Sequence, residues 1–118
     1  MDLTGDWQNQ NGSILRIQSV VKSLVTGLFR SAKGRAAEEE IYSVIGCLNG
    51  DLITLTVDFR NENGNLGSIA NFTGRIEDGS KIHTIWVLAR AFSDAEGKKP
   101  TELWNTFLVN HDVFTKIT

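Results

Sequence analysis

The stretch LITLTVDFR, residues 52–60, alternates apolar and polar side chains with the two-residue period of a β-strand. Successive side chains of a strand point to opposite faces, so this strand should have one apolar and one polar face. Asn49-Gly50 shortly precedes it, and Asn-Gly favours a type I′ hairpin turn, in which both central residues need positive φ. The apolar face is expected to carry Ile53, Leu55, Val57 and Phe59, opposite Thr54, Thr56 and Asp58.

Similar segments lie on both sides of this strand, separated by turn and loop signals. Asn11-Gly12 and Asp78-Gly79 mark two further hairpins, and polar loops are expected at residues 32–39, 61–65 and 91–101. The expected strands are Gly5–Asn9, Ser13–Val20, Leu24–Ser31, Glu40–Leu48, Leu52–Arg60, Ser68–Glu77, Lys81–Arg90 and Leu103–Lys116.

The lengths of the connections between these segments indicate which β-architecture to expect. Residues 35–40 could form a helical turn, but it is too short to be stable alone. Regularly spaced short strands with hairpin turns are typical of a sandwich or an up-and-down barrel. No connection is long enough for a Greek-key crossover, which favours the barrel. We therefore expect an all-β chain with one domain over residues 1–118, folded as an eight-stranded antiparallel up-and-down β-barrel.

Composition and charge exclude several classes of partner. The formal net charge of −2 is too small to attract nucleic acid or an anionic membrane, so neither is expected as a partner. The lone Cys47 cannot form an intrachain disulfide, and neither His83 nor His111 has companions at metal-ligand spacing. No metal or cofactor is expected. The chain begins at Met1 with acidic and polar residues, so no signal peptide is expected in it.

The seventh segment differs from the others because Ile85-Trp86-Val87-Leu88 is apolar on both faces. A strand of a small monomeric barrel should have one wet face. Its outer face is therefore expected to meet another subunit. The alternative is a few scattered exposed apolar residues, which are common in soluble proteins.

Six segments, in order and in register, resemble the avidin and streptavidin family. They are Leu3–Asn9 (LTGDWQN) followed by Gly12-Ser13, Thr26–Ala32 (TGLFRSA), Phe72–Gly74 (FTG), Thr84–Leu88 (TIWVL), Leu103-Trp104 and His111–Lys116 (HDVFTK). Each segment alone is weak evidence for the family, but together the six segments cover nearly the whole chain. The resemblance implies a barrel that buries biotin as a ligand, with the ureido ring at the closed bottom and the valerate tail at the open mouth.

The resemblance also assigns roles to individual residues. Asn9 and Ser13 match donors to the ureido oxygen, while Asp112 and Ser31 match acceptors from the two ureido N–H groups. An ionised carboxylate makes one of these a charge-assisted hydrogen bond. The walls match Trp86, Leu88, Phe59 and Phe72, and Trp104 matches a tryptophan that closes a neighbouring subunit's site. Trp7 is expected to be a core residue.

The sequence departs from the family at several of these positions. Phe29 stands where the family has a tyrosine that donates to the ureido oxygen, and Ala70 where a threonine contacts the ring sulfur. Phe59 and Phe72 stand where streptavidin has tryptophan. We therefore expect biotin binding that is weaker than that of the tightest members.

A further departure lies in the loop after the third strand. Lys33 and Arg35 fall where the family loop is mostly neutral, and one of them could pair with the biotin carboxylate, with Ser68 as a second partner. The alternative is that both cations are solvated, in which case a surface pair contributes little.

The resemblance implies a homo-oligomer as well, with a tetramer favoured. Its outward contacts would come from Ile85, Val87, Val109 and His111, with Trp104 reaching a neighbouring site. It also implies a secreted or periplasmic location.

Two other functions are less well supported. An enzyme is not expected, because the sequence has no nucleophile–base pair, no paired acids and no phosphate loop, and Asp112 is the only good candidate for an ionisable cavity group. A barrel that carries another small apolar ligand, as a lipocalin does, remains the alternative to biotin binding.

Overall fold

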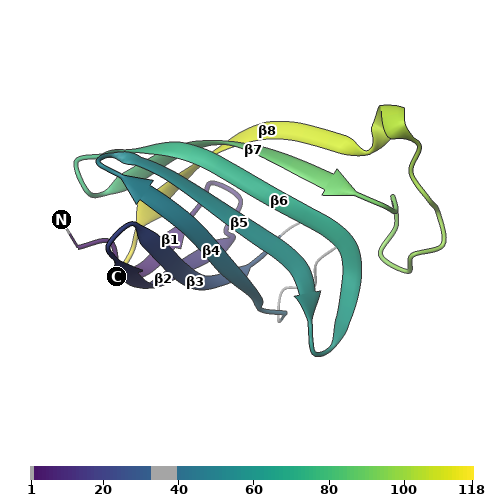
Figure 1. Ribbon diagram of the computed structural model, residues 1–118, viewed down its shortest axis with the longest axis horizontal. Helices are drawn as coiled ribbons and strands as arrows, with labels where there is room; N and C mark the ends of the chain where they lie inside the picture. The colour runs from purple at the N-terminus through teal and green to yellow at the C-terminus, as the bar shows by residue number, and fades with distance from the viewer. Residues whose placement is uncertain (1, 33–39) are drawn as a thin grey trace.

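A computed structural model describes residues 2–32 and 40–118 and arranges them as one closed antiparallel barrel (Figure 1). Each strand pairs with the next along the chain, and β8 pairs with β1 to close the ring. The predicted eight-stranded up-and-down barrel is confirmed. Its strands are β1 (Gly5–Gln8), β2 (Ile14–Val21), β3 (Leu24–Arg30), β4 (Tyr42–Asn49), β5 (Leu52–Asn61), β6 (Gly64–Glu77), β7 (Lys81–Arg90) and β8 (Phe107–Lys116).

Two of the predicted strand boundaries are wrong for local reasons. β6 begins at Gly64 rather than Ser68, because a tight turn pairing Asn61 with Gly64 replaces the expected polar loop. β8 begins at Phe107 rather than Leu103, because residues 103–105 form a short 3₁₀ helix, η1 (Leu103–Asn105). The Asn105 side chain accepts the Glu102 N–H at 2.7 Å, and such local bonds compete with strand pairing.

The three predicted hairpin dipeptides adopt different turns. Asp78 and Gly79 both have positive φ, 52° and 67°, as a type I′ turn requires. At Asn11-Gly12 and Asn49-Gly50 only the glycine has positive φ, so the type I′ prediction is wrong there. Around Asn11 the reason is the side chain of Asn9, which bonds the turn's backbone N–H groups and thereby holds a different geometry.

One end of the barrel interior is packed with buried aliphatic side chains. The alternation predicted for β5 is confirmed, because its apolar positions face inward and are buried, and β2 shows the same pattern at Leu15 and Ile17. We call the packed region the filled end, and it is defined by five aliphatic residues that are at most 3% exposed: Ile17, Val25, Ile53, Ile76 and Ile82. Each side chain of this size stabilises the fold by about 1.5–3 kcal/mol through burial.

Trp7 is part of this core, as expected. Its side chain is 0% exposed, and its indole N–H donates to the Leu3 carbonyl oxygen at 2.9 Å. A buried indole is favourable only when its N–H has such a partner.

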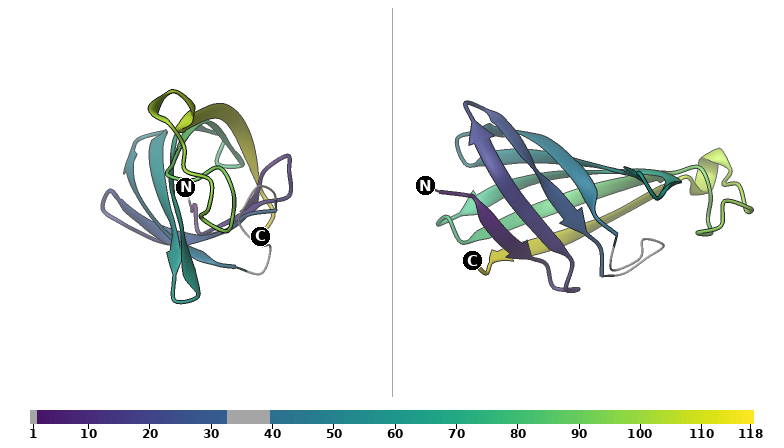
Figure 2. Two further views of the ribbon diagram at one scale, coloured as in Figure 1. Left: turned by 90° about the vertical axis from the view of Figure 1, so that its right-hand side faces the viewer. Right: turned by 90° about the horizontal axis from the view of Figure 1, so that it is seen from below.

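The chain termini and η1 lie at opposite ends of the molecule (Figure 2). β6, β7 and β8 run between these two ends, and the segment with η1 projects beyond the barrel. Within the two described stretches, no helix has the length and apolar character needed to cross a membrane.

Candidate functional site

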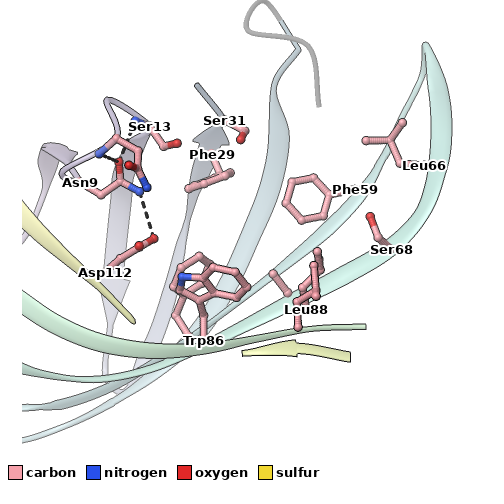
Figure 3. A pocket seen from close by; sticks show the side chains of 14 residues that line it. Asn9, Ser13, Phe29, Ser31, Phe59, Leu66, Ser68, Trp86, Leu88 and Asp112 are labelled. Carbon is pink, nitrogen blue, oxygen red and sulfur yellow. Dashed lines mark hydrogen bonds between the residues drawn. The ribbon is translucent and has the colours of Figure 1, made fainter. Parts of the chain in front are cut away.

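Beyond the filled end, the barrel encloses a cavity of about 260 Å³ (Figure 3). This volume is close to the lower limit for ligand pockets, which is roughly 300 Å³. Eleven of the fourteen predicted site residues line it: Asn9, Ser13, Phe29, Ser31, Phe59, Ser68, Ala70, Phe72, Trp86, Leu88 and Asp112. Asn11, Leu66 and Leu108 also line it.

Polar side chains gather at one side of the cavity, around Asn9, Ser13 and Asp112, and we call this side the polar pole. Asn9 is held there in one orientation. Its Oδ1 accepts the backbone N–H groups of Asn11 at 3.0 Å and Ser13 at 2.9 Å, and its Nδ2 donates to Asp112 Oδ2 at 3.0 Å. These partners distinguish the amide oxygen from the nitrogen. Nδ2 carries two hydrogens, so one donor remains after the bond to Asp112.

The Asp112 carboxylate is held from both sides. It is 6% exposed, and Oδ1 accepts from Gln10 Nε2 at 2.9 Å while Oδ2 accepts from Asn9. Thr84 Oγ1 donates to the Asp112 backbone carbonyl at 2.9 Å from the neighbouring strand. Each carboxylate oxygen can accept more than one bond, so both keep acceptor capacity for a ligand.

Gln10 is a residue that the sequence analysis missed. Besides its bond to Asp112, its Nε2 donates to the His111 carbonyl at 3.2 Å and its Oε1 accepts the Val113 N–H at 3.1 Å. One side chain thus holds three consecutive residues of β8 against the end of β1. Nothing in the local sequence marks this role, because it depends on the β1–β8 closure.

Two serines add hydroxyl groups to the polar part of the lining. Ser13 Oγ accepts the Ala32 backbone N–H at 2.9 Å, which leaves its hydroxyl proton to be donated elsewhere. Ser31, directly after β3, is also buried and lines the cavity. The pole therefore combines amide and hydroxyl donors with a carboxylate acceptor.

Aromatic rings form the opposite wall (Figure 3). The Phe29 ring centroid lies 6.2 Å from that of Phe59 and 6.0 Å from that of Phe72, and Phe72 lies 6.5 Å from Trp86. Edge and tilted contacts at these distances are the favourable geometries for aromatic pairs. The Trp86 Nε1–H is buried and has no acceptor among the described residues, so a ligand or water oxygen in the cavity could supply one.

Tyr42 supports this wall from behind. Its ring packs edge-on against Phe59 at 5.0 Å. Burial raises the pKa of the Tyr42 hydroxyl above its ordinary value, and the nearby Glu40 carboxylate adds to the rise. Tyr42 is therefore neutral at physiological pH.

The three remaining predicted residues lie elsewhere. Lys33 and Arg35 fall outside the described residues. Trp104 is 83% exposed on η1 and does not line the cavity of its own chain. Its predicted contact with a neighbouring subunit stays a prediction.

Two of the missed lining residues are Leu66 and Leu108, and only Leu66 had a sequence signal. Leu66 has the same parity along β6 as Ser68 and Ala70, but the predicted polar loop hid it. Leu108 pairs directly with Leu88 across β7 and β8, which only the register reveals.

The chemistry of the cavity suits the binding of a small ligand. No group of three or more potential metal-ligating residues (His, Cys, Asp or Glu) occurs in the part of the chain that the structure describes. The Asp112 carboxylate is fixed as an acceptor, with donors beside it and hydrocarbon opposite. Such a site fits a small ligand that has a polar head with both acceptors and donors and an apolar body.

Comparisons with known proteins agree with this geometry. A shwanavidin variant in complex with biotin matches with a TM-score of 0.80 and 27% identity, covering 99% of each chain. Bradavidin2 in complex with biotin matches with a TM-score of 0.79 and 26% identity over 100% of both chains. Rhizavidin in complex with biotin matches with a TM-score of 0.78 and 27% identity, over 98% of this chain and 92% of that one. The sequence model described as the avidin family matches residues 1–117, and the chain therefore belongs to the avidin family.

Proposed function

We propose that this protein binds biotin in the barrel cavity and releases it unchanged. The observation that carries the proposal is the fixed Asn9–Asp112 pair at one pole of a cavity with aromatic walls. A cyclic urea has one strong acceptor and two donors in a plane, and this pole offers the complementary groups. Structures of similar proteins in complex with biotin support the same ligand.

In the proposed complex, the ureido oxygen accepts from Asn9 Nδ2 and Ser13 Oγ. One ureido N–H donates to Asp112 and the other to Ser31. The bicyclic ring packs between Phe29, Phe72 and Trp86, and the valerate tail points towards Ser68 at the start of β6. Asp112 already accepts two amide bonds, which suits an acceptor better than a general base.

The affinity should be below that of the tightest family members. Phe29 has no hydroxyl to donate to the ureido oxygen, and a lost hydrogen bond costs about 1–3 kcal/mol when its partner stays unpaired. Ala70 cannot donate to the ring sulfur. Phe59 and Phe72 also present less surface than tryptophan would.

Calorimetric titration with biotin tests the proposal, with a straight-chain fatty acid of similar length as the control ligand. We expect saturable biotin binding, little binding of the fatty acid, and recovered biotin of unchanged mass. Absence of biotin binding at micromolar concentrations would overturn the proposal. Binding of the fatty acid alone would favour a carrier of other apolar ligands.

We also propose that the chain assembles as a homo-oligomer, with a tetramer favoured, through Ile85, Val87, Val109 and His111. Ile85 is 60% and Val109 66% exposed on adjacent strands, so they form part of an uncovered apolar face. Trp104 would reach a neighbouring site from η1. Native mass measurement with and without biotin tests the assembly, and a species at 13.1 kDa only would contradict it.

A secreted or periplasmic location is proposed from the family resemblance alone. Fractionation of the source cells, with an antibody against the protein, tests it. Recovery with cytoplasmic markers only would contradict the proposal.

A further inference from the structure

We infer that Arg90, on β7 at the mouth of the cavity, pairs with the carboxylate at the free end of the bound ligand. The inference rests on the proposed function and names the residue that would distinguish a charged tail from a neutral one. It places this role on a strand of the barrel instead of on Lys33 or Arg35.

The register of β7 brings Arg90 to the cavity mouth. The inward positions of this strand are Ile82, Thr84, Trp86 and Leu88, and Arg90 is the next in the series. Leu88 lines the cavity, and Arg90 lies two residues, about 6.6 Å, further along the strand. Its Cα partner on β6 is Ser68, which is buried and also lines the cavity.

A second hollow of about 580 Å³ adjoins the cavity at this point. Ser68 borders both hollows, and the second also contains Arg90, Arg60 and Asp58. Arg60 Nη2 pairs with Asp58 Oδ2 at 2.9 Å, so these two charges compensate each other. Arg90 is then the cation of this hollow that has no carboxylate partner within the described stretches.

The Arg90 side chain is anchored but incompletely satisfied. Its Nη2 donates to the Asn105 carbonyl at 3.3 Å, and its backbone is bonded to Thr101 and Thr106. Its Nε–H is buried and has no acceptor among the described residues. A guanidinium can donate to a carboxylate through Nε and one Nη in parallel, so a ligand carboxylate would satisfy the unpaired donor.

Competition binding of biotin and biotin amide to the full chain tests the inference. The two ligands differ in the charge of the tail and share the ureido ring, so their affinity ratio isolates the tail. We expect the parent to prefer biotin by roughly tenfold, the lower end for a charge-assisted pair at a partly open site. Arg90→Gln should bring the ratio close to one, mainly by lowering the affinity for biotin, and Arg90→Lys should give an intermediate ratio.

Arg60→Gln is the matched control, because Arg60 borders the same hollow but is already paired. It should keep the parent's ratio. A parent that binds both ligands equally, a parental ratio retained in Arg90→Gln, or an equal loss in Arg60→Gln would each overturn the inference. A ratio lost only in the Lys33→Ala, Arg35→Ala double variant would overturn it in favour of those cations. If the parent binds neither ligand, the proposed function itself fails.

Discussion

The filled end and the cavity end of this barrel are built from the same strands with the same alternation, yet their interiors differ completely. At the filled end, isoleucine and valine side chains are almost fully buried and pack into the hydrophobic core. At the other end the inward positions include Ser13, Ser31, Ser68 and Ala70, which are too small to fill the space. Both ends follow the same inward–outward alternation. Large inward side chains stabilise the fold at one end, and small inward side chains leave room for a ligand at the other.

The largest effect expected is from a cavity in the filled end. Ile82→Ala should lower the free energy of unfolding by about 2–5 kcal/mol, because Ile82 is 0% exposed and its packing would be lost. Biotin affinity should change little, since Ile82 does not line the cavity. Denaturant unfolding at fixed protein concentration and calorimetric titration measure the two quantities. Ile82→Val, which removes less volume, should cost about 0.5–1.5 kcal/mol, and an affinity loss as large as the stability loss would show that the two ends are coupled.

At the polar pole of the cavity we expect the opposite result, a loss of biotin affinity with little loss of stability. Asp112→Asn keeps the side-chain volume but removes the charge, so biotin should bind about 10–100-fold more weakly. Stability should change less than in Ile82→Ala, because the new amide oxygen can still accept from Asn9 and only the bond from Gln10 is lost. Titration of this variant beside Asp51→Asn, an exposed carboxylate far from the cavity, tests the effect. Equal affinities for the two variants would remove Asp112 from the proposed site.

The two ends also differ in how far the sequence predicts them. Alternation identified Ile53 as an inward residue, because burial repeats every second position. The family resemblance placed Asn9 and Asp112 together although they are 103 positions apart. Gln10 was missed because its bonds depend on how β1 meets β8, which no local pattern encodes. η1 was missed because side-chain bonds from Asn105 and Thr106 decide its geometry.

Gln10 gives a smaller test of the same pole. Gln10→Ala should weaken biotin binding by about 1 kcal/mol, or roughly fivefold, because Asp112 loses a positioning bond while its charge remains. Calorimetric titration measures the change, with Gln8→Ala as a control at an exposed position on β1. If Gln10→Ala binds like the parent, the Asn9 bond alone is enough to hold the carboxylate.

The last effect expected is a gain in affinity, similar in size to the loss expected from Gln10→Ala. Phe29→Tyr would add a hydroxyl to a ring that already lines the cavity, and the resemblance places that hydroxyl against the ureido oxygen. One added neutral hydrogen bond should improve affinity by about 0.5–1.5 kcal/mol, measured by competition with labelled biotin. Phe72→Tyr is the matched control, because its ring centroid lies 6.0 Å from that of Phe29 but its hydroxyl would have no urea partner. A gain in Phe29→Tyr and a loss in Phe72→Tyr would fix the direction in which the ligand's polar head lies. Equal effects would mean that the head is not held at the pole formed by Asn9 and Ser13.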